Sequence, residues 1–384
     1  MKTFSIVKLE TVAQTVLLSG MKLMTTIRRI ACGIFIWSAA VVVGATPVEV
    51  TPAPTGGALQ PQVSCDDQGR VFVVYGQGND IFVAVSQNTD LHFQAASKVG
   101  KLPKLALGMR RGPRIATSGR ALVVTAMNDK DLFAFHSEDA GRTWSAATRI
   151  NGVAASAREG LGNLAAGPEG RFYATWLDLR SGAAEIYGAL SRDGGKTWGA
   201  NERVYRSPDG HVCECCHASV AFNARGDLVV MWRNALHGAR DLWTVVLPAG
   251  SEQFDPPMRQ GVASWKLEGC PMDGGVVFAQ ADNSFASVWQ REGGVYLSTG
   301  PGKESNLGDG TQPVALAARG VVHVWWQRGA KLMHTTIGAT EEPAVFAQEA
   351  KFASAAVSPK DGAVVVAFER TVSGRKTIFA EVLR

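Results

Sequence analysis

The chain has 384 residues, 46% of them hydrophobic and 19% charged, with 42 glycines and ten tryptophans. This composition excludes intrinsic disorder, a collagen-like repeat, a disulfide-dense miniprotein and a polytopic membrane protein, and it supplies ample apolar surface for a core. The formal charge is +5, but five basic residues and one acidic residue within residues 1–45 account for +4 of it, so the rest of the chain offers no support for nucleic-acid binding.

Residues 1–45 predict export from the cytoplasm. Two arginines precede an apolar run that ends in small residues suited to signal-peptide cleavage after Ala45. The first twenty residues add nothing that a signal needs, so we expect translation to start at Met21 or Met24. An uncleaved signal anchor is the alternative. Export would place a mature domain, residues 46–384, in the periplasm or outside the cell, where disulfides form.

A sequence unit repeats seven times along residues 55–384. Each unit has a short strand of small residues, an apolar run that ends in a large side chain, and a third strand after a polar loop. The runs are rich in β-branched and aromatic residues, which is typical of antiparallel sheets. The seven apolar runs are GRVFVVYG from Gly69, ALVVTAMN from Ala121, GRFYATWLD from Gly170, GDLVVMWRN from Gly226, NSFASVWQR from Asn283, GVVHVWWQR from Gly320 and GAVVVAFER from Gly362.

A period of roughly 40–55 residues with three or four strands per unit predicts an all-β fold, a β-propeller of four-stranded antiparallel blades. We count seven blades, with six as the alternative. The last unit ends after its third strand, and residues 46–51 are apolar enough to supply the missing outer strand and close the ring. We therefore expect one propeller domain over residues 46–384, and a monomer.

Two of the third strands run into nearly identical turns, SEDAGRTW at residues 137–144 and SRDGGKTW at residues 191–198, with a weaker echo at residues 86–93. An aspartate can accept hydrogen bonds from the turn's own amides, glycine supplies backbone freedom and tryptophan packs between sheets. The pattern resembles the Asp-box, or BNR, repeat of the sialidase-like propellers, and the resemblance implies that these residues are structural. They are Ser137, Asp139, Gly141, Trp144, Ser191, Asp193, Gly195 and Trp198.

The resemblance implies a fold more firmly than an activity. Catalytic sialidases bind the substrate carboxylate with three arginines, beginning with an Arg-Ile-Pro stretch, and use a tyrosine–glutamate pair. The nearest string here is Arg114-Ile115-Ala116, and Tyr296 has no obvious glutamate partner in the sequence. We therefore assign no catalytic residue, and an exo-sialidase-like glycoside hydrolase is an alternative function.

One face of the predicted propeller carries the loops between the second and third strands together with the connections between blades. An arginine lies at or just beyond the end of the second strand in five blades, and guanidinium groups bind carboxylates bidentately. These arginines form a candidate rim for an anionic ligand. The alternative is that they pair with acids such as Asp178, Glu292 and Glu369. The candidate ligand-binding residues are Arg180, Arg233, Arg291, Arg328, Arg370 and His237.

Two blade connections on this face are rich in sulfur. HVCECCH occupies residues 211–217 between blades 3 and 4, and CPMD begins at Cys270 between blades 4 and 5. One interpretation is structural disulfides among Cys213, Cys215, Cys216 and Cys270. A second is a copper or zinc site made by those cysteines with His217 and Met272. A third is c-type haem at the C-x-x-C-H pattern, which we do not expect because a packed propeller leaves little room. Cys65 is expected to be a lone buried thiol.

These patterns predict an exported binding protein for an anionic ligand, an acidic glycan or a protein segment, contacted on the face of blades 3 to 6. A periplasmic protein that handles copper or another metal is a further alternative to the glycosidase. The sequence predicts no nucleic-acid partner and no membrane contact beyond the signal peptide.

Overall fold

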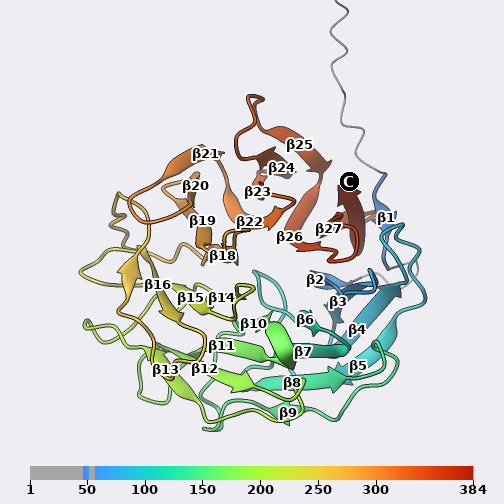
Figure 1. Ribbon diagram of the computed structural model, residues 1–384, viewed down its shortest axis with the longest axis horizontal. Coiled ribbons are helices and arrows are strands. Elements are labelled where there is room, and N and C mark those ends of the chain that lie inside the picture. The colour runs from blue at the N-terminus through green and yellow to red at the C-terminus, as the bar shows by residue number, and fades with distance from the viewer. Residues whose placement is uncertain (1–45, 52–56, 384) are drawn as a thin grey trace, which may run out of the picture. The chain divides into compact units, whose positions relative to one another are not determined.

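Seven four-stranded antiparallel sheets follow one another around a ring in the computed structural model, which describes residues 46–51 and 57–383 (Figure 1). The predicted signal peptide lies outside these residues. Within them, no helix is long and apolar enough to cross a membrane. The fold is the predicted seven-bladed β-propeller, and the six-bladed alternative is wrong.

Each blade takes four strands, and the first strand of each lies nearest the centre of the ring (Figure 1). Blade 1 contains β2 (Leu59–Cys65), β3 (Val71–Gln77), β4 (Asp80–Ser86) and β5 (Ser97–Lys101). Blade 2 contains β6 (Arg114–Ser118), β7 (Ala121–Met127), β8 (Leu132–Ser137) and β9 (Thr148–Arg149). Blade 3 contains β10 (Asn163–Ala166), β11 (Phe172–Asp178), β12 (Glu185–Ser191) and β13 (Glu202–Tyr205), with a 3-10 turn, η1 (Pro168–Gly170), after β10.

The remaining blades repeat this order. Blade 4 contains β14 (Ser219–Phe222), β15 (Leu228–Arg233), β16 (Leu242–Leu247) and β17 (Met258–Arg259). Blade 5 contains β18 (Val276–Ala279), β19 (Phe285–Arg291), β20 (Gly294–Ser298) and β21 (Ser305–Asp309). Blade 6 contains β22 (Thr311–Ala318), β23 (Val321–Arg328), β24 (Lys331–Thr336) and β25 (Ala344–Gln348). Blade 7 contains β26 (Ala350–Val357), β27 (Val364–Val372), β28 (Arg375–Leu383) and β1 (Val48–Glu49).

The ring closes through its two ends, as the sequence predicts. β1 pairs antiparallel with β28, with Val48 opposite Ala380 and Glu49 opposite Phe379. The first strand of the described chain therefore completes the last blade as its outer strand, which leaves the C-terminal strand without an open edge.

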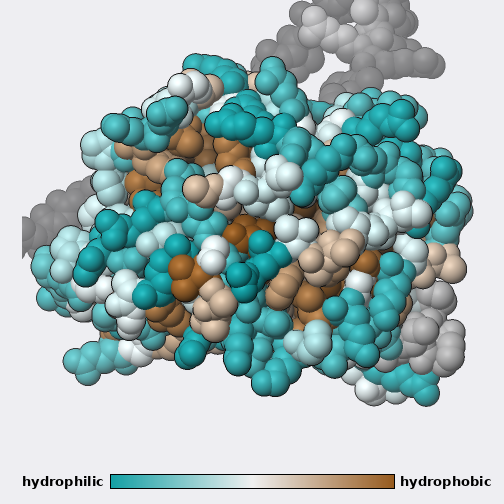
Figure 2. Space-filling model, turned by 90° about the horizontal axis from the view of Figure 1, so that it is seen from below, coloured by the Kyte–Doolittle hydropathy of each residue, from teal (hydrophilic) through white to brown (hydrophobic). Residues whose placement is uncertain are grey.

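The second strands supply most of the core because their side chains are buried on both faces of the sheet. Trp176, Trp232 and Trp325, each on the second strand of its blade, are at most 1% exposed. They pack between neighbouring blades, so each blade is stabilised by the next one along the ring. Polar residues cover much of the surface seen in Figure 2, with apolar side chains showing between them in separate patches.

The antiparallel order fixes which loops share a face. Loops between the second and third strands lie on the same face as the connections between blades, while the other turns lie on the opposite face. A β-bridge joins Val212, in the connection between blades 3 and 4, to Asn234, in the loop after β15. It shows a blade connection and a loop between second and third strands side by side. We call this face the cysteine face, because it carries Cys213, Cys215, Cys216 and Cys270.

Candidate functional site

The two aspartate turns, residues 137–144 and 191–198, lie on the opposite face, between the third and fourth strands. In the first, Asp139 Oδ1 accepts hydrogen bonds from Ser137 Oγ at 2.9 Å and the Thr143 amide at 2.9 Å. Gly141 donates its amide to Ser137 Oγ at 2.9 Å. Hydrogen bonds led by that with Thr143 lower the pKa of Asp139 to about 2. The carboxylate therefore serves the turn's own amides and hydroxyls.

The second turn repeats these contacts, since Asp193 accepts from Ser191 Oγ at 2.9 Å and from Thr197 Oγ1 at 2.6 Å, and Gly195 donates to Ser191 Oγ. Trp144 packs against the core between blades 1 and 2, and Trp198 packs against the core between blades 2 and 3.

On the cysteine face, the HVCECCH segment is held against the end of the second strand of blade 4. The Cys213 amide donates to the Arg233 carbonyl at 3.0 Å, and the Val212 amide donates to the Ala184 carbonyl at 2.9 Å. The segment therefore spans from blade 3 to blade 4 with its first cysteine fixed by backbone contacts. Cys213 and Cys216 are 4% and 2% exposed.

The second sulfur-rich connection passes very close to the first, and two adjacent glycines permit this. A Cβ on Gly274 would lie 1.9 Å from the carbonyl oxygen of His217, a distance that no side chain tolerates. The close passage brings Cys270 to Cys215, and the two form a disulfide with a Cα–Cα distance of 6.1 Å. Met272 follows, with its Sδ 3.5 Å from Cys270 Sγ.

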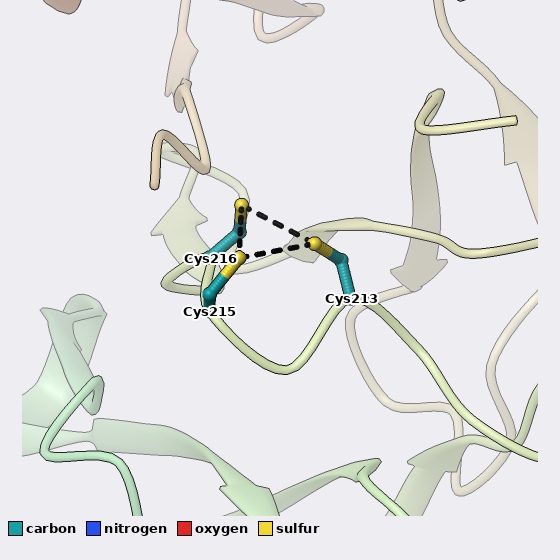
Figure 3. A group of neighbouring side chains, drawn as sticks. All are labelled: Cys213, Cys215 and Cys216. Atoms are coloured by element: carbon teal, nitrogen blue, oxygen red, sulfur yellow. Dashed lines mark hydrogen bonds between the residues drawn. The ribbon is translucent and has the colours of Figure 1, made fainter. Parts of the chain in front are cut away.

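The three sulfur atoms of the HVCECCH segment form a triangle (Figure 3). Cys213 Sγ lies 3.6 Å from Cys215 Sγ and 3.5 Å from Cys216 Sγ, and the last two are 3.9 Å apart. Among the described His, Cys, Asp and Glu side chains, these three form the one group with ligand atoms close enough to share a metal ion. Cys213 and Cys216 are free thiols.

The two free thiols have different acidities. The hydrogen bond with Cys216, aided by the charges of Arg233 and Arg240, lowers the pKa of Cys213 to about 7. The same hydrogen bond and burial raise the pKa of Cys216 well above its usual range. Cys213 is therefore the thiol that ionises first. Cys65, at the end of β2 on the opposite face, is a free buried thiol as predicted, and burial raises its pKa to about 12.

Arg233 is part of the frame beneath the cysteines. It is 1% exposed and donates three hydrogen bonds to backbone carbonyls. Nε donates to Asp273 at 2.8 Å, Nη1 to Arg240 at 2.5 Å and Nη2 to Gln290 at 2.8 Å. The guanidinium thus ties β15 to the Cys270 connection and to β19 of the next blade.

Two further arginines are buried near the same place. Arg110 donates to Gln312 Oε1 at 2.6 Å, and Arg114 donates to the carbonyls of Gly112 and Pro113. Burial lowers the pKa of both, and the charge of Arg110 helps to lower that of Arg114 to about 9. Asp273, 1% exposed, lies in electrostatic range of Arg110 and accepts from the Gln312 amide at 2.6 Å.

His217 lies in an environment of positive charge. It is buried, its Nε2 lies 2.9 Å from the Gly275 carbonyl, and burial together with Arg110, Arg114 and Arg233 lowers its pKa well below the usual range. Because a carbonyl only accepts, Nε2 carries the proton and the ring is neutral. The ring does not belong to the sulfur group that could share a metal ion.

The structure distributes the predicted rim arginines among different environments. Arg180 forms a bidentate pair with Asp178, with both contacts at 2.8 Å, and Arg291 forms one with Glu304 at 2.8 and 2.5 Å. Arg291 therefore pairs with Glu304 and not with Glu292. The charges of both guanidinium groups are neutralised inside their own blades.

The other rim residues remain nearer to solvent. Arg328 is exposed at the end of β23. Arg370 donates to the Gln348 carbonyl at 3.1 Å and lies over the rings of Phe368 and Phe379. Glu369, considered as its partner, instead accepts from the Gln60 amide at 2.5 Å. His237 is 82% exposed in its side chain, 3.4 Å from Asp209.

A cavity of about 290 Å³ opens beside the sulfur atoms, and Arg240 lines it together with His211, Cys213, Cys215 and Cys270. Arg240 Nε donates to the Gly269 carbonyl at 3.4 Å, while its two terminal nitrogens have no hydrogen-bond partner among the described residues. Glu214 and Glu159 also line the cavity, and Glu159 pairs with Arg111 at 3.6 Å.

Sequence reasoning missed Arg240 and Arg110. A signal for Arg110 was present, because the stretch MRRGPR places three arginines within five residues of a blade connection on the cysteine face. Nothing in the sequence distinguishes Arg240 from other loop arginines.

A tyrosine–glutamate pair does occur, but away from this face. Tyr173 donates to Glu202 Oε1 at 2.8 Å, near the start of β11, on the same side as the aspartate turns. Tyr173 is fully buried, and burial raises its pKa well above the usual range. This pair therefore packs within blade 3.

No family model matches the sequence, and no curated protein matches it. Many solved structures match its fold, three of which follow. A protein of unknown function from Dyadobacter fermentans has a TM-score of 0.52 at 12% identity, and the catalytically inactive virginiamycin B lyase from Staphylococcus aureus, with quinupristin, has 0.52 at 13%. The α-L-arabinanase of Penicillium chrysogenum, complexed with arabinobiose, has 0.50 at 14%. Each match covers 88% of this chain and 98% of the other, and at these identities the likeness concerns the fold alone.

Proposed function

We propose that this protein is an exported, monomeric, sialidase-like propeller that binds an anionic ligand, an acidic glycan or an acidic protein segment, on its cysteine face. The observation that carries the proposal is an excess of buried positive charge beneath that face. Arg110, Arg114 and Arg233 are 7%, 5% and 1% exposed, and within the described residues none of them forms a salt bridge.

Among the buried groups at this place, Asp273 is the acid in electrostatic range of Arg110 and His217 is neutral, so the three arginines exceed the buried acid by two charges. Removing an ion from water costs several kcal/mol unless an opposite charge lies near. An anion held at the cysteine face would offset that cost. Buried charges of one sign also focus the potential toward the nearest opening and raise the local concentration of an oppositely charged ligand.

Arg240 is the side chain that we expect to contact the ligand. Its unpartnered terminal nitrogens line the cavity, and a guanidinium binds a carboxylate through two parallel hydrogen bonds. Arg328 and Arg370 would extend the contact along the rim for a longer ligand, whereas Arg180 and Arg291 are already paired.

The buried pair of Tyr173 and Glu202 does not favour the glycosidase alternative, because it lies on the opposite face. A binding protein should leave a fluorogenic sialoside intact. Release of the fluorophore at a rate that depends on this chain would favour the hydrolase instead.

Calorimetry with sialyllactose and with neutral lactose tests the proposal, and acidic peptides extend it. We expect an acidic ligand to bind and neutral lactose not to bind. Added salt should weaken the binding, because exposed charges are screened. The Arg240→Gln variant should lose about tenfold or more in affinity, which corresponds to about 1.4 kcal/mol. Arg142→Gln, an exposed arginine in a turn of the opposite face, is the matched control and should bind like the wild type. Equal binding of charged and neutral ligands would contradict the proposal.

A further inference from the structure

The proposed function assigns no role to the sulfur atoms of the cysteine face. Cys213, Cys215 and Cys216 converge within one segment, while Cys270 and Met272 approach from the neighbouring connection. Backbone contacts fix Cys213, and the disulfide to Cys270 fixes Cys215. Two of the three converging sulfur atoms are nonetheless free thiols.

The triangle of sulfur atoms has the size that a three-coordinate metal requires. With sides of 3.6, 3.5 and 3.9 Å, the point equidistant from the three sulfur atoms lies about 2.1 Å from each, close to the roughly 2.3 Å of a zinc–thiolate bond. A metal ion of this size therefore fits between the three sulfur atoms after a shift of a few tenths of an ångström.

We infer that Cys213, Cys215 and Cys216 form a trigonal site for Cu(I), and that the disulfide between Cys215 and Cys270 is the closed form of this site. The inference goes beyond the proposed function and does not depend on it. In the closed form Cys215 is bonded to Cys270, so two thiols face the centre of the triangle. Freeing Cys215 supplies the third ligand.

The donor set selects the metal. All three ligands are sulfur, and thiolate and thioether donors select Cu(I), whereas zinc in structural sites takes four ligands. Neither His217 nor Cys270 offers a fourth, because neither belongs to the group of described ligand atoms that lie within 4.8 Å of one another. Three thiolates with Cu(I) carry two negative charges, and Arg233 and Arg240 lie in electrostatic range of Cys213. The surroundings therefore stabilise the loaded site.

Opening the site is a two-electron step. A dithiol reductant donates two electrons and two protons to the Cys215 and Cys270 sulfur atoms, their S–S bond breaks into two thiols, and the reductant becomes a disulfide. Cu(I) then replaces the thiol protons of the three ligands. The free Cys270 thiol remains beside Met272, outside the triangle.

Anaerobic titration of the mature protein with Cu(I) against a chromophoric Cu(I) chelator tests the inference. Reduced protein should bind one equivalent, and the disulfide form should bind at least a hundredfold more weakly. The Cys270→Ser variant, kept anaerobic, should bind one equivalent without prior reduction, because Cys215 then has no Cys270 thiol to pair with. X-ray absorption of the loaded protein should show three sulfur neighbours.

The Cys215→Ser variant should lose Cu(I) binding. The matched control Cys65→Ala should retain it. Circular dichroism checks that each variant folds. If a variant does not fold, Cu(I) binding by the reduced wild type still tests the site. Less than one tenth of an equivalent in reduced wild type would overturn the inference, and so would equal binding with and without the disulfide. Tighter retention of Zn²⁺ than of Cu(I) would overturn the choice of metal.

Discussion

Replacing Arg233 with methionine tests whether this arginine holds blades 4 and 5 together. The substitution preserves length and apolar volume but removes three hydrogen bonds, to the carbonyls of Asp273, Arg240 and Gln290. The donor of all three bonds is the charged guanidinium of the buried Arg233. Without it, the three carbonyls would lack hydrogen-bond partners unless water entered.

An unpartnered buried acceptor costs about 1–3 kcal/mol. The three losses are not additive, and removal of one uncompensated buried charge offsets part of them, so we expect a net destabilisation of about 3–5 kcal/mol. For a domain of this size that corresponds to a fall in melting temperature of roughly 5–10 °C. Arg233→Lys keeps the charge with fewer directed donors and should lie between the two.

Melting temperatures from tryptophan fluorescence and circular dichroism measure the effect. Arg328→Met, at an exposed position of the corresponding loop in blade 6, is the matched control and should change the melting temperature by less than about 1 °C, because surface substitutions are usually worth under 0.5 kcal/mol. A change of less than 2 °C in Arg233→Met would refute the reasoning and return Arg233 to the set of free rim arginines.

Three further predictions concern the turns, the glycine contact and acid stability. Asp139→Ala should lower the melting temperature by a few degrees, because the turn loses its hydrogen bonds, and Asp193→Ala should add to it, since the two turns lie in different blades. Gly274→Ala should prevent the passage beside His217 and yield little folded protein, whereas Gly269→Ala, where an added Cβ meets nothing closer than 3.8 Å, should fold normally by circular dichroism. Burial and His323 lower the pKa of His334 to about 4 from 6.5, so the unfolded chain takes up this proton first as the pH falls. The folded state therefore keeps its full stability above pH 6.5 and loses about 3 kcal/mol of its free energy of unfolding by pH 4. His334→Gln should make the melting temperature fall less steeply between pH 6.5 and 4. An unchanged slope would contradict the lowered pKa of His334.

The sequence predicted the architecture well because the propeller depends on local patterns. Apolar second strands recur at a regular spacing, and residues 46–51 are apolar enough to complete blade 7, where β1 pairs with β28. The order of antiparallel strands also placed the HVCECCH segment and Cys270 on one face, and the close passage at Gly274 brought them into contact.

The electrostatic partners were harder to predict because they depend on three-dimensional packing. Asp178 lies two residues from Arg180, and their pairing was the alternative to a ligand-binding role for Arg180. Glu304 lies just before the outer strand β21, and the pairing of β20 with β21 brings it to Arg291. The burial of Arg110 near Asp273, from blade connections far apart in the chain, follows from ring closure and could not be read from spacing.

The most direct test of the central claim is to locate a bound anion. A crystal soaked in selenate and measured at the selenium absorption edge gives an anomalous signal wherever the anion binds. We predict a peak in the cavity beside Arg240 that vanishes in Arg240→Gln crystals. Selenate bound only at arginines of the opposite face, with the Arg240 cavity empty, would contradict the claim that the buried positive charge serves an anion on the cysteine face.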